Sequence, residues 1–198
     1  MRVHVVHAHP VETSYNRTLY HTACEALAQS GHEVDGLSLY DEKFDAALSR
    51  EERLNYHDVP GNITDHVRPY VERLKAADAL VFVHPVWNFG YPAILKGYFD
   101  RIFLPGVSFV MSSAADKGTF RNTLDNIKKV AFVTTYGGSR WRALLVGDPP
   151  RTLARRWAWA TFRPQSRPKY LALYDMNNND EHALNSFVAK VRYELRRF

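Results

Sequence analysis

A loop at residues 9–16 carries side chains suited to holding an anion. It reads His-Pro-Val-Glu-Thr-Ser-Tyr-Asn and joins an apolar stretch to a segment with helical spacing. Thr13, Ser14 and Asn16 therefore stand beside the first free N–H groups of an expected helix, where a phosphate meets amide donors, hydroxyls and the positive end of the helix dipole. Neither a Walker sequence nor G-x-G-x-x-G is present, so phosphate binding and a plain helix cap at Ser14 both stay open.

Two further loops suit a flat ligand. Residues 84–92 read His-Pro-Val-Trp-Asn-Phe-Gly-Tyr-Pro, and their rings can wall such a ligand while stiff prolines hold the backbone. The alternative is that Trp87, Phe89 and Tyr91 cap the core or bury a subunit interface. Residues 134–139 read Thr-Thr-Tyr-Gly-Gly-Ser, where paired glycines allow close approach of backbone amides, although a plain tight turn has the same composition.

The elements that position these loops follow from the hydrophobic pattern. Short apolar strands are expected at residues 3–6, 33–40, 79–83, 130–135 and 170–174. Helices are expected at residues 14–30, 49–56, 92–103, 152–162 and 181–197, with one more up to residue 74 that Asn62 or Thr64 caps. This alternation predicts a doubly wound α/β fold with a five-stranded parallel sheet, formed as a single domain over residues 1–198. Ligands of such sheets bind beyond the carboxyl ends of the strands, where the three loops lie.

Composition narrows the class of protein. A hydrophobic content of 45% with 13% aromatic residues can fill a core, which excludes disordered, collagenous and coiled-coil chains. Cys24 is the only cysteine, so neither a disulfide framework nor a cysteine zinc cluster can form, and it is expected to be a small core residue. There is no signal-like start and no apolar run of about 18 residues, so we expect a cytoplasmic protein without membrane insertion.

The net charge of +5 is concentrated in one segment, because residues 140–169 contain eight basic side chains and only one acidic side chain, Asp148. The segment lacks a nucleic-acid recognition motif, so we expect no nucleic-acid partner; a phosphate-bearing cofactor or an acidic partner is the better match. His4, His7 and His9 have no cluster of carboxylates nearby, which favours core or loop positions and predicts no metal site.

Several motifs carry a family resemblance. They are His9-Pro10 with Thr13-Ser-Tyr-Asn16, the run Pro85-x-x-x-Phe-Gly-x-Pro-Ala-Ile-Leu-Lys-Gly-Tyr-Phe-Asp-Arg-Ile-Phe103, Lys117-Gly118, and Thr134-Thr-x-Gly-Gly-Ser139. Over residues 1–140 the sequence resembles the flavodoxin-like NAD(P)H quinone oxidoreductases, a family that includes DT-diaphorase-type and bacterial quinone reductases and flavoproteins attached to potassium-efflux systems. The resemblance implies a flavodoxin-like sheet with strand order 2-1-3-4-5 and a non-covalently bound flavin.

The same resemblance implies which residues hold the flavin. The phosphate and ribityl chain would lie against His9, Thr13, Ser14, Tyr15 and Asn16. The O4, N5 and N3 side of the isoalloxazine would lie against Pro85, Val86, Trp87, Asn88 and Phe89. The N1 and O2 side, where negative charge develops on hydride arrival, would lie against Thr134, Thr135, Gly137 and Gly138.

The implied function is hydride transfer from NAD(P)H through the flavin to a quinone or similar flat acceptor, with ping-pong kinetics. FMN is expected, with FAD as the alternative, because the chain lacks the C-terminal extension of the larger FAD-binding members. Members of the family are homodimers, so a homodimer is expected. A flavin-bearing regulatory subunit of a membrane transporter remains the alternative function, whereas the basic charge disfavours an electron carrier.

One departure from the family pattern concerns catalysis. Tyr136 is inserted between the threonines and glycines, and no histidine lies between His84 and His182, so the tyrosine–histidine relay of DT-diaphorase-type members is absent or replaced. Tyr136, Arg140 and Arg142 are the candidates for stabilising negative charge on the reduced flavin. Trp87, Phe89 and Tyr136 are expected as the stacking walls.

Overall fold

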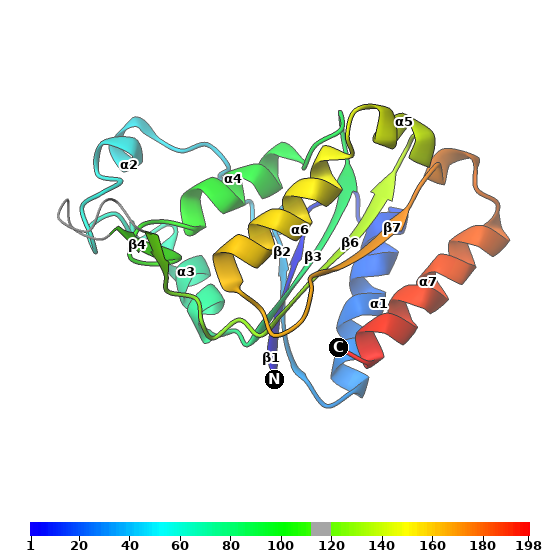
Figure 1. Cartoon of the computed structure of the whole chain (residues 1–198), viewed down its shortest axis with the longest axis horizontal. Helices are drawn as coiled ribbons and strands as arrows, with labels where there is room; N and C mark the ends of the chain where they lie inside the picture. Colours follow the sequence, from blue (N-terminus) through cyan, green and yellow to red (C-terminus); the bar gives the residue numbers. More distant parts are fainter. Residues whose placement is uncertain (112–119) are drawn as a thin grey trace.

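The computed structural model describes residues 1–111 and 120–198, and its centre is a five-stranded parallel sheet (Figure 1). The strand order is β2-β1-β3-β6-β7, so the predicted order 2-1-3-4-5 is confirmed, with β6 and β7 as the fourth and fifth strands of this sheet. The strands are β1 (Arg2–His7), β2 (Glu33–Ser38), β3 (Ala79–Val86), β6 (Lys129–Tyr136) and β7 (Lys169–Leu173).

Helices cover both faces of the sheet. The sheet packs on one face against α1 and α7 and on the other against α3, α4 and α6, forming two hydrophobic clusters (Figure 1). The helices are α1 (Tyr15–Gln29), α2 (Arg50–Leu54), α3 (Arg68–Ala76), α4 (Ala93–Ile102), α5 (Arg140–Leu145), α6 (Pro149–Phe162) and α7 (Glu181–Arg196), with a 3-10 turn, η2, at Met176–Asn178.

The two central strands are apolar on both faces because both faces are covered. β3 and β6 run side by side, with Phe82 paired to Phe132 and Val83 to Val133. The Phe82 and Phe132 rings stack with centroids 5.1 Å apart, and all four side chains are fully buried. A rigid, buried pair of strands therefore carries the second and third loops.

Polar side chains cap the starts of α1, α2, α5 and α7, whereas α3 begins without such a cap. Ser14 caps α1 by accepting a hydrogen bond from the Arg17 amide at 3.2 Å, and Asp180 caps α7 in the same way. The prediction that Asn62 or Thr64 caps the third helix is wrong, because α3 begins at Arg68 after Val67 and has no side-chain cap. Asn62 is instead buried and donates hydrogen bonds to two backbone carbonyls.

Some elements were not expected from the pattern. A two-stranded antiparallel ribbon forms from β4 (Phe109–Met111) and β5 (Phe120–Asn122). The Lys117-Gly118 motif lies outside the described residues. A short helix, α5, follows the glycine loop, and α6 starts three residues earlier than predicted, at Pro149, where proline suits the first turn.

The histidines of β1 are structural. The buried His4 ring pairs through Nδ1 with Asp35 at 2.9 Å and through Nε2 with the Tyr98 hydroxyl at 3.2 Å. His7 is also fully buried, and burial together with the nearby Arg17 lowers its pKa to about 3. Cys24 is half-buried against the cluster that α1 forms with the sheet.

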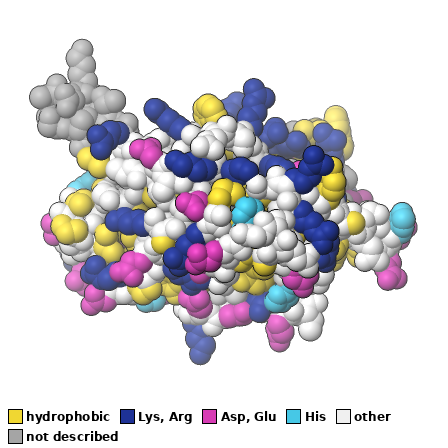
Figure 2. Space-filling view, turned by 90° about the horizontal axis from the view of Figure 1, so that it is seen from below, with side chains coloured by type: hydrophobic (Ala, Val, Ile, Leu, Met, Phe, Trp, Pro, Cys, Tyr) yellow, Lys and Arg dark blue, Asp and Glu magenta, His cyan; other side chains and the backbone are white. Residues whose placement is uncertain are grey.

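The basic segment of the sequence forms α5, α6 and the start of β7. Lys and Arg side chains gather along the upper edge of the view in Figure 2, on the side of the molecule that carries α6. Within the ranges 1–111 and 120–198, every helix is too short or too polar to cross a membrane.

Candidate functional site

A cleft of about 200 Å³ opens at the carboxyl ends of β1, β3 and β6. The loops that follow these strands converge there, as expected for a parallel sheet. Nine of its eleven lining residues are ones that the sequence predicted to bind cofactor. The lining residues are His9, Ser14, Tyr15, Asn16, Pro85, Val86, Trp87, Thr135, Gly137, Met176 and Asn177.

The first turn of α1 gives this cleft its anion-binding character. The first N–H groups of a helix have no intrahelical partner, and the helix dipole adds partial positive charge. Asn16, in this turn, is 3% exposed, and neither atom of its side-chain amide has a hydrogen-bond partner in the described part of the chain. A buried amide without partners costs stability, so this one is placed to meet polar atoms of a ligand.

His9 and Tyr15 frame the same cleft but are already engaged. The Val11 amide donates to His9 Nδ1 at 3.1 Å, and burial lowers the pKa of His9, which favours the neutral ring. The Tyr15 hydroxyl donates to the Leu184 carbonyl of α7 at 2.8 Å, and burial raises its pKa to about 12. Tyr15 therefore anchors the first loop to α7, and its ring borders the cleft.

A tight turn at the end of β3 presents two aromatic rings. The Trp87 and Gly90 backbones exchange two hydrogen bonds, of 3.2 and 2.9 Å, across the turn. Asn88 and Phe89 between them have φ values of 47° and 58°, a left-handed conformation that costs about 1–3 kcal/mol for such residues and is enriched at functional sites. Trp87 and Phe89 are 41% and 45% exposed, so both residues are accessible to a ligand.

A second cleft of about 200 Å³ adjoins the first. Val86 and Gly137 line both clefts, so the two lie on either side of the ends of β3 and β6. Its lining residues are Val86, Asn88, Phe89, Tyr136, Gly137, Gly138, Ser139, Arg142 and Ala143. The structure thus places the aromatic turn, the glycine loop and Arg142 around one cavity.

The ring of Tyr136 does not form an exposed wall, contrary to the sequence expectation. Its side chain is 3% exposed and stacks on Tyr174 with ring centroids 4.3 Å apart. Its hydroxyl donates to Asp148 Oδ1 at 2.6 Å and lies 2.6 Å from the Tyr170 hydroxyl, while the Tyr174 hydroxyl donates to Asp148 Oδ2 at 2.8 Å. Burial, the neighbouring Tyr170 and the bond to Asp148 raise the pKa of Tyr136, so it stays protonated. These bonds turn the ring away from solvent and fix the strand just before the glycine loop.

Three predicted residues line neither cleft. Thr13 and Arg140 are exposed outside them, and Thr134 is fully buried, with a hydroxyl that has no hydrogen-bond partner among the described residues. Thr134 and Thr135 alternate along β6, so only Thr135 can face the first cleft.

The sequence reading missed the loop after β7. Met176 and Asn177 line the first cleft, and the Asp175 amide donates to the Gly138 carbonyl at 2.9 Å. The amide nitrogen of Asn177 lies 3.3 Å from the position a Cβ would take on Gly137. This loop also follows a strand of the parallel sheet, so the rule that selected the other three loops could have found it.

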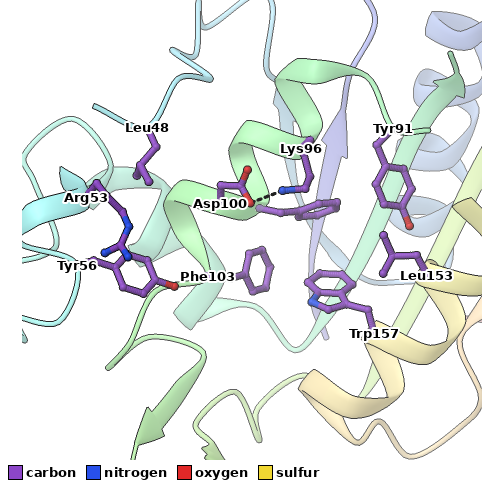
Figure 3. A pocket seen from close by; sticks show the side chains of 10 residues that line it. Leu48, Arg53, Tyr56, Tyr91, Lys96, Asp100, Phe103, Leu153 and Trp157 are labelled. Atoms are coloured by element: carbon purple, nitrogen blue, oxygen red, sulfur yellow. Dashed lines mark hydrogen bonds and ion pairs between the residues drawn. The ribbon is translucent and has the colours of Figure 1, made fainter. Parts of the chain in front are cut away.

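A separate aromatic cavity of about 460 Å³ lies between α2, α4 and α6 (Figure 3). The Phe103, Trp157 and Leu153 side chains line its floor, and the Lys96–Asp100 ion pair lies on its rim (Figure 3). Tyr91 reaches it from the aromatic loop, where its hydroxyl donates to the Pro150 carbonyl at 3.1 Å. This cavity contains none of the predicted cofactor residues.

The sheet order, the helices on both faces and the paired clefts at the strand ends define a flavodoxin-like α/β protein. The chain belongs to the Flavodoxin_2 family, described as having a flavodoxin-like fold, whose model matches residues 1–154. The family resemblance predicted from the motifs is confirmed.

Relatives and solved structures extend this result. The chain is 34% identical over 153 residues to NAD(P)H dehydrogenase [quinone] 1 of Cavia porcellus, which covers 70% of this chain and 54% of that protein. It is 34% identical over 112 residues to the FMN-dependent NADH:quinone oxidoreductase of Lachnoclostridium phytofermentans, covering 54% and 52%. It thus spans about half the length of the curated relatives it matches. The structure of NAD(P)H:quinone oxidoreductase from Methanothermobacter marburgensis has the same fold, with a TM-score of 0.84 over 99% of this chain and 98% of that one at 23% identity.

Proposed function

We propose that this protein is a flavin-dependent NAD(P)H oxidoreductase that transfers hydride to a quinone or similar flat acceptor. The observation that carries the proposal is the pair of adjoining clefts, with a buried, unpartnered Asn16 amide in the first and an open aromatic turn beside the second. One cleft suits a polar, phosphorylated tail and the other suits a flat ring. The names of the two relatives, both quinone oxidoreductases, support this reading.

The residues of the clefts fit FMN. Ser14, Asn16 and the first turn of α1 would hold the phosphate, with Thr13 at the loop rim and His9 and Tyr15 beside the ribityl chain. The isoalloxazine would lie at the junction of the clefts, where Val86 and Gly137 line both. The Lachnoclostridium relative is named as an FMN-dependent enzyme, which supports FMN over FAD.

Bound FMN would supply the chemistry of accepting and releasing a hydride. The protein would contribute position and electrostatics. Gly137 and Gly138 would let backbone amides approach the ring edge where negative charge develops, and Arg142 would place a cation at the same cleft. Tyr136, held by Asp148, would act as a positioning residue for this glycine loop. Arg140 lines neither cleft, so we give the role of charge stabilisation to Arg142.

Nicotinamide and quinone would use the same stacking space. Trp87 lines the first cleft beside Pro85, and Phe89 lines the second beside Asn88; both Trp87 and Phe89 are exposed. A shared space requires the first product to leave before the acceptor enters, which is the ping-pong order. Double-reciprocal plots of NAD(P)H oxidation at several benzoquinone concentrations are then parallel, whereas lines that intersect would contradict a shared site.

The role of Arg142 has its own test. Replacing Arg142 with Gln should lower the midpoint potential of bound FMN and slow reduction by NAD(P)H about tenfold, because a cation beside the ring favours its reduced, anionic form. Arg140→Gln is the matched control on the same helix. Equal potentials and rates in both variants would remove the electrostatic role of Arg142.

We also propose a homodimer that covers the outer face of α5. Trp141, Leu144 and Leu145 are 67%, 51% and 68% exposed on this six-residue helix, and an apolar patch of this kind is typical of an interface. Light scattering should give twice the monomer mass, and Leu145→Glu should shift it toward the monomer. A monomeric wild-type protein at micromolar concentration would exclude this interface.

A further inference from the structure

A group of arginines surrounds the exposed indole of Trp159 on α6. A cleft of about 400 Å³ is lined by Arg155, Arg156 and Trp159 of α6 and by Arg167 and Pro168 just before β7. Residues 155 and 156 are four and three positions before residue 159, so their side chains share one face of the helix. The chain segment before β7 brings Arg167 to this face from outside the helix.

These three guanidinium groups have no acidic partner in the part of the chain that the structure describes. Among the described residues, none of the three forms an ion pair or a side-chain hydrogen bond, and Trp159 is 55% exposed. Several other arginines of the chain are paired, as Arg101 is with Glu52 at 2.6 Å. Unpaired cations that converge on one cleft create a positive potential that attracts an anion. The clustering of Lys and Arg on this side of the molecule is visible in Figure 2.

The residue types point to a phosphate joined to an aromatic ring. Guanidinium groups bind phosphate oxygens through paired, charge-assisted hydrogen bonds. An indole offers a flat face on which a nucleobase stacks. The same cleft therefore offers partners for both parts of a phosphorylated adenosine.

A continuous surface joins this cleft to the proposed flavin site. Between them lies a shallow apolar cleft of about 550 Å³, lined on α6 by Pro149, Leu153 and Arg156. It shares Phe89 with the second flavin cleft and Arg156 with the basic cleft. From Pro149 to Trp159 the axis of α6 advances about 15 Å, a path suited to an extended dinucleotide rather than to a single nucleotide.

We infer that the Arg155–Arg156–Arg167 cleft binds the 2′-phosphoadenosine end of NADPH while the nicotinamide reaches the flavin site past Phe89. The inference rests on the proposed function and makes it specific, because NADH lacks the phosphate that these arginines would recognise. NADPH is then the preferred hydride donor. The 2′-phosphate of NADPH would then be the ligand of the basic segment, residues 140–169.

The test separates this cleft from the flavin chemistry. Titration of the full-length protein with adenosine 2′,5′-bisphosphate, followed by tryptophan fluorescence and by calorimetry, reports binding whether or not the enzyme turns over. Adenosine 5′-monophosphate is the probe without the 2′-phosphate. The variant is Arg155→Gln combined with Arg167→Gln, since these two residues line the basic cleft and none of the other clefts described above. Arg50→Gln on α2 is the control, because Arg50 is exposed and lines none of these clefts.

The bisphosphate is expected to bind the wild type at least tenfold more tightly than the monophosphate. The double variant should lose this difference and lower the NADPH-to-NADH ratio of kcat/KM at least tenfold, because each charge-assisted hydrogen bond to phosphate accounts for roughly a factor of ten. Equal binding of the two nucleotides, or a single-stranded oligonucleotide that binds more tightly than the bisphosphate, would overturn the inference. If the protein binds the bisphosphate as expected but oxidises neither NADPH nor NADH, the proposed function fails and the cleft assignment stands.

Discussion

Replacing Asn16 with Leu should change stability and cofactor affinity in opposite directions. Asn16 is 3% exposed with both amide atoms unpartnered, so the flavin-free protein bears the cost of burying a polar group without hydrogen bonds. That cost is about 1–3 kcal/mol, and leucine has a similar size without polar atoms. The free energy of unfolding of the flavin-free protein should therefore rise by about 1–3 kcal/mol.

The affinity for FMN should fall in the same variant. If the Asn16 amide completes the phosphate and ribityl site, its loss removes one or two hydrogen bonds to a charged ligand, which is about 10- to 100-fold in Kd. Urea unfolding of flavin-free protein measures the first effect, and quenching of FMN fluorescence on binding measures the second.

Asn62→Leu is the matched control. Asn62 is equally buried but its amide donates to the Tyr56 and Pro105 carbonyls at 3.0 Å each, and it lies outside both clefts. This substitution should destabilise the protein by about 2–3 kcal/mol and leave FMN affinity unchanged. An Asn16→Leu variant that is less stable than wild type and binds FMN normally would refute the reasoning.

Two further predictions concern buried groups. Tyr136→Phe removes the hydroxyl that donates to buried Asp148 and should lower the free energy of unfolding in urea by about 1.5–3 kcal/mol. The control Tyr193→Phe, at an exposed ring, should lower it by less than about 0.5 kcal/mol. Equal losses of stability in the two variants would contradict the buried network. Burial lowers the pKa of His7 to about 3 and that of His84 to about 4, so both rings are neutral when folded and protonate below about 6.5 when unfolded. The contribution of these two histidines to the free energy of unfolding is therefore complete above pH 6.5 and falls by about 1.4 kcal/mol per ring for each pH unit below it. A free energy of unfolding that is unchanged between pH 7 and pH 5 would contradict this prediction.

Much of the fold could be predicted because its strongest signals are local. Five apolar strands separated by helical segments specify a parallel sheet, and the strand order follows from the family motifs. The errors concern features set by tertiary contacts. Asn62 has the composition of a helix cap, but two distant carbonyls bind its amide inside the core.

The site was predictable where residues follow strands directly, and less so where the direction of a side chain matters. Trp87 and Asn16 reach the clefts because a loop and a first helical turn place them there. Tyr136 carries the same aromatic signal as Trp87, yet Asp148, twelve residues further on, takes its hydroxyl into the interior. Sequence spacing alone does not specify which hydroxyl such a buried carboxylate binds. The loop containing Asn177 lacks a composition typical of a cofactor loop and is found only from its position after β7.

The absorbance spectrum of the purified protein, with reconstitution by FMN, tests the central claim most directly. We expect maxima at about 370 and 450 nm from bound oxidised flavin, with the 450 nm band lost on anaerobic addition of NADPH and restored by a benzoquinone. A colourless protein that takes up neither FMN nor FAD would contradict the assignment of the two clefts as a flavin site.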